Sequence, residues 1–197
     1  MSRIFLRCVR FAFLASVLGL AACAGGERTG PNLGTASRHP GLSCAPFARE
    51  LSGIALYGEA YSWWDGAAGQ YGRDRRPQIG SVLVFRRTDR LPSGHVSVVS
   101  GVLGARQILV IEANWVPDEL DEDQLIVDVS GNNDWSAVRV WYPPANQMGA
   151  HVYPTYGFVL PPRPATHAEL IRAAGPAATY GLQTQGRPLP RARFAGG

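Results

Sequence analysis

The segment His95-Val96-Ser97-Val98-Val99-Ser100-Gly101-Val102 decides the fold, because a β-branched, apolar run here follows the turn residues Pro92, Ser93 and Gly94. Short runs of this kind, bounded by Gly, Pro, Asn and Asp, are typical of β-strands. Five others occur in the chain: Ser81–Phe85, Gln107–Ala113, Leu125–Val129, Val138–Tyr142 and Tyr156–Leu160. Together they predict a mostly antiparallel meander of about five or six strands.

Two segments with helical spacing precede these strands. After Cys44, the residues Ala45, Ala48 and Leu51 recur on one helical face, and Pro46 is tolerated in a first helical turn. A second apolar stripe consists of Ala60, Trp63, Trp64, Ala67, Ala68 and Tyr71. Its spacing favours core packing over a sugar-stacking surface. Helices followed by strands predict an α+β fold, with the N-terminal helices packed on one face or end of the sheet.

The N-terminus has the layout of an export signal. An arginine-containing start precedes the apolar run Phe11–Leu20, which is too short to span a bilayer. The sequence Leu20-Ala21-Ala22-Cys23 resembles a bacterial lipobox, which predicts cleavage before Cys23 and a lipid on its sulfur. Ordinary secretion is the alternative, because Ala22-Cys23-Ala24 also fits the small-x-small pattern. We therefore expect a protein of the bacterial cell envelope, anchored to a membrane and facing the periplasm or the cell exterior.

The composition divides the chain into four parts. We predict a signal peptide over 1–22, a flexible tether over 23–42, a folded domain over 43–160 and a Pro/Arg-rich disordered tail over 161–197. Thr166 and Glu169 have the spacing of a capping box, which predicts one short helix in the tail. From Cys44 to Leu160, nine Arg oppose thirteen Asp plus Glu, a balance of −4 that argues against a nucleic-acid-binding surface.

Cys44 is the candidate nucleophile. Cys8 and Cys23 are removed or acylated in the exported protein, so Cys44 has no disulfide partner. A helix N-terminus would stabilise its thiolate. His95 opens a strand, Glu112 is a carboxylate in an apolar run that needs a partner, and Asn114 is expected on the same face as Glu112. These residues could supply a base and its orienting group, although a buried structural cysteine and a surface histidine remain the alternative interpretation.

We predict no metal and no cofactor. His39, His151 and His167 lack the close spacing of a zinc site. The acidic stretch Asp118–Asp123 lacks the alternating ligands and central Gly of an EF-hand, which favours a solvated acidic loop.

The chain resembles the CHAP domains, the cysteine, histidine-dependent amidohydrolases/peptidases of the papain-like superfamily, from about Cys44 to about Leu160. The resemblance is carried by the Cys44 segment and by four further blocks: Gly58-Glu59-Ala60 leading into Trp63-Trp64, Pro77 and Gly80 before Val82-Leu83-Val84-Phe85, Gly94-His95-Val96-Ser97-Val98-Val99, and Ile111-Glu112-Ala113-Asn114-Trp115. One departure is Ser43, where many members carry a Gln or Asn beside the nucleophile.

The resemblance implies a papain-like fold and a catalytic set. Cys44 would be the nucleophile and His95 the general base, with Glu112 or Asn114 orienting the imidazole. The implied substrate is a peptidoglycan stem peptide, cleaved through a thioester intermediate by a stem-peptide endopeptidase or an N-acetylmuramoyl-L-alanine amidase. The alternative is a weak or inactive peptidoglycan-binding or regulatory module with the same fold.

Overall fold

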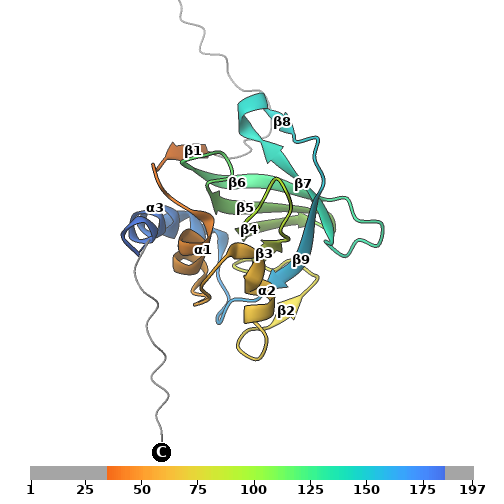
Figure 1. Cartoon of the computed structure of the whole chain (residues 1–197), viewed down its shortest axis with the longest axis horizontal. Helices are drawn as coiled ribbons and strands as arrows, with labels where there is room; N and C mark the ends of the chain where they lie inside the picture. The colour runs from red at the N-terminus through yellow and green to blue at the C-terminus, as the bar shows by residue number, and fades with distance from the viewer. Residues whose placement is uncertain (1–34, 185–197) are drawn as a thin grey trace, which may run out of the picture. The chain divides into compact units, whose positions relative to one another are not determined.

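The computed structural model describes residues 35–184, and its central feature is a closed barrel of antiparallel strands (Figure 1). Neighbouring strands pair in the order β6-β5-β4-β3-β9-β7, and β7 pairs back onto β6 through Ile126 and Val140. The barrel strands are β3 (Val82–Phe85), β4 (His95–Gly104), β5 (Gln107–Ala113), β6 (Glu119–Asp128), β7 (Ala137–Tyr142) and β9 (Tyr153–Val159).

Short elements surround this barrel. Three more strands extend it: β1 (Thr35–Arg38) pairs with β6, β2 (Arg73–Asp74) with β9, and β8 (Gln147–Met148) with β7. The helices are α1 (Cys44–Ser52), α2 (Trp63–Gly66) and α3 (His167–Thr184), with 3₁₀ turns η1 (Ala60–Ser62) and η2 (Pro143–Ala145).

The predicted α+β class, with helices packed on a papain-like sheet, is wrong. The fold is mostly β, because the six long strands close on themselves instead of forming an open sheet. The expected second helix over 60–71 shrinks to η1 and the four-residue α2. Gly66 ends α2, and Gly69 has a φ of 74°, a left-handed conformation that interrupts a helix.

The strands separate two apolar cores, because successive side chains of a strand point to opposite faces. Inside the barrel pack Leu83, Phe85, Val99, Ile108, Val110, Ile126, Trp135, Val138, Val140 and Phe158. The outer core joins the strands to α1 and α3, and it includes Phe47, Leu51, Val82, Val96, Val98, Ile111, Leu120, Leu170 and Ala174. On β4, Val96 and Val98 face the helices, so His95 and Ser97 face the interior.

Two elements lie outside the predicted domain boundaries of 43–160. Strand β1 lies in the expected tether, and α3 occupies much of the expected tail. The predicted capping box is present, since both the backbone N–H and the hydroxyl of Thr166 donate to Glu169 at 2.8 Å. Helix α3 packs on α1 and covers one side of the outer core. The folded part of the chain therefore needs residues beyond Leu160.

The acidic stretch is not a solvated loop. Residues 119–123 form the first half of β6, where Asp121 is buried inside the barrel. The predicted export signal and Cys23 lie outside the described residues. Within residues 35–184, no helix has the length and apolar character needed to cross a membrane.

Candidate active site

Cys44 is the first residue of α1, and its half-buried thiol is the free cysteine of the described segment. Ser43 is the N-cap residue, with an extended backbone and no side-chain capping hydrogen bond. The first N–H groups of a helix have no partners within it. The backbone of Val96, on β4, acts to lower the pKa of the Cys44 thiol. The prediction that Cys44 begins a helix is confirmed.

His95 is placed by the glycine that precedes it. Gly94 has a φ of 68°, and a Cβ at this position would lie 2.6 Å from the backbone nitrogen of Tyr61 and 2.9 Å from the carbonyl oxygen of Phe85. Only glycine fits such a position. The chain can therefore pass close under η1 and enter β4 with the His95 ring inside the barrel rim, only 4% exposed.

Glu112 faces His95 from the neighbouring strand. Its Oε2 lies 2.8 Å from Nε2 of His95, and the carboxylate is fully buried. Ser97, on the same face of β4 as His95, donates a hydrogen bond from its hydroxyl to the same oxygen. A buried carboxylate is expensive without such partners. Because Nε2 faces Glu112, Nδ1 is the ring nitrogen that remains for Cys44.

The electrostatics of these three groups favour an ion pair. Burial acts to raise the pKa of the Cys44 thiol, but the charge of His95 and hydrogen bonds from His95 and Val96 outweigh it, so the pKa lies below its ordinary value. Burial acts to lower the pKa of His95, but Cys44 and then Glu112 stabilise the imidazolium and raise this pKa. A thiolate beside an imidazolium is the reactive form of a cysteine nucleophile.

A cysteine at a helix start, with a strand-borne histidine and a carboxylate behind it, is the arrangement that the sequence resemblance implied. Residues 34–114 match the CHAP domain family. The match confirms the resemblance and contains Cys44, His95, Glu112 and Asn114. CHAP domains are generally amidase or peptidase hydrolases, and the family is of the peptidoglycan hydrolase type. No curated protein matches the chain.

Asn114 does not share the interior face of the barrel with Glu112. Strand β5 ends at Ala113, and Asn114 turns to a left-handed φ of 64°. Its exposed side chain accepts a hydrogen bond from the backbone of Asp118 at 3.0 Å. The strand ends one residue before Asn114, so the alternation that predicted a shared face for Glu112 and Asn114 does not reach Asn114. Of the two candidate orienting residues, Glu112 is the one that contacts His95, and Asn114 shapes the following turn.

Asp121 is a polar member of this region that the sequence reasoning missed. It is the cross-strand partner of Glu112, is 2% exposed and lies among the interior side chains. Burial, and then the charges of Glu112 and Glu119, raise the pKa of Asp121 to about 7, against the effect of His95. Its Oδ2 and Glu112 Oε1 have no hydrogen-bond partner among the described residues. Strand alternation was the available signal: Leu120 faces the outer core, so the next residue, Asp121, points into the barrel.

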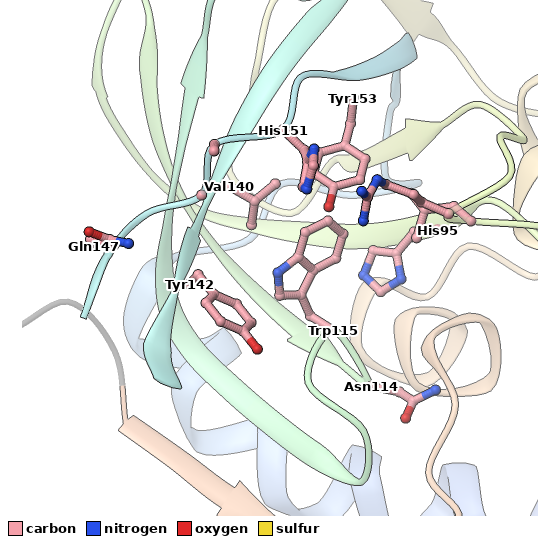
Figure 2. A pocket seen from close by; sticks show the side chains of 12 residues that line it. His95, Asn114, Trp115, Val140, Tyr142, Gln147, His151 and Tyr153 are labelled. Carbon is pink, nitrogen blue, oxygen red and sulfur yellow. The ribbon is translucent and has the colours of Figure 1, made fainter. Parts of the chain in front are cut away.

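A pocket of about 470 Å³ opens beside His95 (Figure 2). Trp115 lies at its centre, with His95 on one side and Tyr142 on the other. The pocket is lined by Arg90, Leu91, His95, Asn114, Trp115, Val140, Tyr142, Gln147, Gly149, Ala150, His151 and Tyr153. Sequence reasoning missed it, because its walls come from β4, β7, β8, β9 and the loops between distant strands.

The remaining histidines of the described segment have other surroundings. The ring of His39 lies 3.1 Å from the Ser37 hydroxyl, and His167 pairs with Asp123 at 2.8 Å. Within residues 35–184, no three His, Cys, Asp or Glu side chains are grouped so that they could hold a metal ion.

Proposed function

We propose that this chain is a cysteine-dependent hydrolase that cleaves an amide bond in peptidoglycan. The observation that carries the proposal is the line from Cys44 to His95 to Glu112, in which His95 lowers the pKa of a helix-start thiol and a buried carboxylate lies 2.8 Å from the imidazole. The match to the CHAP domain family supports the substrate class. An export signal, as expected from the sequence, agrees with a substrate outside the cytoplasm.

The chemistry follows from the ion pair. The Cys44 thiolate attacks the carbonyl carbon of the scissile amide, and the developing oxyanion accepts hydrogen bonds from backbone N–H groups at the start of α1. The His95 imidazolium gives its Nδ1 proton to the leaving amine, and a thioester remains on Cys44. His95 then takes a proton from water, whose oxygen attacks the thioester and releases the acid. Glu112 holds the ring and stabilises its charged form.

The test is digestion of purified peptidoglycan by the full-length chain in mild detergent, with mass analysis of the released fragments. Full length is needed because α3 packs on α1. We expect wild-type protein to release fragments that Cys44→Ala and His95→Ala do not. The matched control is His39→Ala, since the His39 ring bonds Ser37 and does not line the pocket beside His95. A new N-terminal amine within the stem would identify an endopeptidase, and free muramic acid carboxylate would identify an amidase.

Identical digests from wild type and Cys44→Ala would overturn the enzymatic proposal. In that case, binding to sedimented peptidoglycan would favour the non-catalytic wall-binding module, the alternative that the sequence left open.

We also propose that the protein is held at the cell envelope by a lipid on Cys23. The support is the lipobox-like Leu20-Ala21-Ala22-Cys23 after an apolar run. Cys23→Ala should move the protein from the membrane to the soluble fraction and abolish incorporation of labelled fatty acid. Unchanged membrane association of Cys23→Ala would exclude the lipid anchor.

A further inference from the structure

The pocket beside His95 has an aromatic floor. The ring centroids of Trp115 and His95 lie 5.2 Å apart, and those of Trp115 and Tyr153 lie 5.0 Å apart. The ring centroid of His151 lies 6.4 Å from that of Tyr153. Edge-to-face packing at these distances holds aromatic rings in fixed orientations. The floor therefore runs outward from the proposed general base, and Figure 2 shows His151 and Tyr153 on the side of Trp115 away from Asn114. A substrate whose scissile bond reached Cys44 would extend across it.

The charge of the pocket is positive although the domain is acidic. Residues 44–160 carry nine Arg and thirteen Asp plus Glu, yet none of the twelve residues that line the pocket is an Asp or a Glu. Arg90 is exposed and makes no hydrogen bond, ion pair or ring contact with any described residue. By contrast, Arg86 donates a hydrogen bond to the backbone carbonyl of Thr155, and Arg139 donates one to the backbone carbonyl of Gly149.

Tyr153 adds a neutral donor to the same wall. Burial, and then the charge of Glu112, raise the pKa of its hydroxyl against the effect of Arg90, so the hydroxyl keeps its proton at neutral pH. A phenol hydroxyl and a guanidinium that line one pocket offer donors without a competing acceptor charge. This donor set matches an anionic oxygen group of a ligand.

We propose that this pocket is a substrate subsite for a free carboxylate of the peptide, with Arg90 as the residue that binds it and the Trp115 and Tyr153 rings supporting the peptide chain. The inference rests on the proposed function, because a peptidoglycan stem peptide is the ligand that would bring such a carboxylate next to His95. A planar guanidinium binds carboxylates through two parallel hydrogen bonds, so the subsite would separate free acids from their amides.

The test measures binding, so it does not depend on turnover. Full-length Cys44→Ala protein is titrated calorimetrically with L-Ala-γ-D-Glu-L-Lys, blocked as the amide at its C-terminus, and with the same peptide carrying a carboxamide in place of the free glutamate carboxylate. We expect the acid to bind about tenfold tighter than the amide, the effect of one charge-assisted contact. Adding Arg90→Gln should remove the difference and leave binding of the amide unchanged.

The matched control is Arg76→Gln in the same Cys44→Ala background. Arg76 is also exposed, its side chain makes no hydrogen bond, ion pair or ring contact with any described residue, and it does not line the pocket. It should keep the tenfold preference, which separates a local contact from the loss of one positive charge. Equal binding of acid and amide by Cys44→Ala, or an equal loss in both arginine variants, would overturn the subsite.

The two proposals fail differently. If wild type leaves peptidoglycan intact but Cys44→Ala still prefers the acid through Arg90, the hydrolase proposal falls and the subsite stands. If wild type releases fragments but acid and amide bind alike, the subsite falls and the hydrolase stands.

Discussion

Replacing Asp121 with Asn should stabilise the protein at pH 8 far more than at pH 5. Asp121 is 2% exposed, faces Glu112 across the β5–β6 pair, and leaves Oδ2 without a hydrogen-bond partner among the described residues. An ionised carboxylate there suffers both desolvation and repulsion from Glu112. Asparagine has nearly the same shape and carries no charge, so it removes the repulsion while filling the same space.

The magnitude follows from proton linkage. The pKa of Asp121 is raised from 3.8 to about 7 in the folded state. Over that interval the folded protein keeps a proton that the unfolded chain has released, so the stability of wild type falls as the pH rises from about 4 to about 7. At about 1.36 kcal/mol per pH unit, the whole interval corresponds to about 4 kcal/mol, and the two units above pH 5 correspond to about 2.7 kcal/mol.

The assay is urea unfolding followed by circular dichroism at pH 5, 6, 7 and 8, for wild type and Asp121→Asn. The difference in free energy of unfolding between the two proteins should grow in favour of the variant by about 2.7 kcal/mol from pH 5 to pH 8. Glu122→Gln, the next residue of β6, controls for the loss of one carboxylate from this strand; its carboxylate faces the Thr35 hydroxyl on β1. A difference that stays constant within about 0.5 kcal/mol across this pH range would refute the reasoning.

Three further predictions concern the site and its support. Glu112→Gln should lower kcat on peptidoglycan by about 10²- to 10⁴-fold, because the imidazole loses the carboxylate that fixes its tautomer and charge. Cys44 should react with iodoacetamide at pH 6 to 7 faster than a cysteine in a short peptide, since its pKa is lowered by His95, and His95→Ala should remove the advantage. Gly94→Ala should cost about 2 kcal/mol or more in urea unfolding, because its Cβ would lie 2.6 Å from the Tyr61 backbone nitrogen at a left-handed φ.

Each of these has a clear contrary result. Turnover of Glu112→Gln within threefold of wild type would mean that the carboxylate does not orient the ring. A Cys44 alkylation rate that follows the ordinary thiol titration would mean that no thiolate is stabilised. Unchanged unfolding of Gly94→Ala would show that the contact with η1 can relax without cost.

Local patterns in the sequence predicted the strands well. All six expected runs overlap observed strands, because period-two alternation is a local property. Four agree within two residues at both ends: Ser81–Phe85, His95–Val102, Gln107–Ala113 and Val138–Tyr142. The apolar surroundings of Glu112 correctly indicated that it needs a partner, and that partner is His95. Such a charge in a buried strand is informative because its cost must be met by a nearby group.

Long-range properties were not predictable in the same way. Closure of the barrel depends on the pairing of Ile126 with Val140, and the hydrophobic pattern of either strand is equally compatible with an open sheet. The acidic stretch was interpreted as a solvated loop because a run of acidic residues is usually exposed. The burial of Asp121 depends instead on the register of β6 against β5, which pairs it with Glu112. The prediction that Asn114 shares a face with Glu112 was wrong for a local reason. Asn114 has a left-handed φ just after the end of β5, and strand alternation cannot detect such a turn.

Because the barrel closes, the residues of the proposed chemistry and those of the proposed selectivity come from different parts of the chain. Cys44, His95 and Glu112 all lie within the segment that matches the CHAP domain family, residues 34–114. Much of the pocket wall comes from later residues, including Tyr142 and Tyr153, which reach His95 because β7 pairs with both β6 and β9. Changes in residues 140–153 could therefore alter which peptide is held beside the thiol without touching the groups that lower its pKa. In this arrangement, the proposed thiol activation depends on α1, β4 and β5, and the proposed substrate choice depends on how the barrel closes.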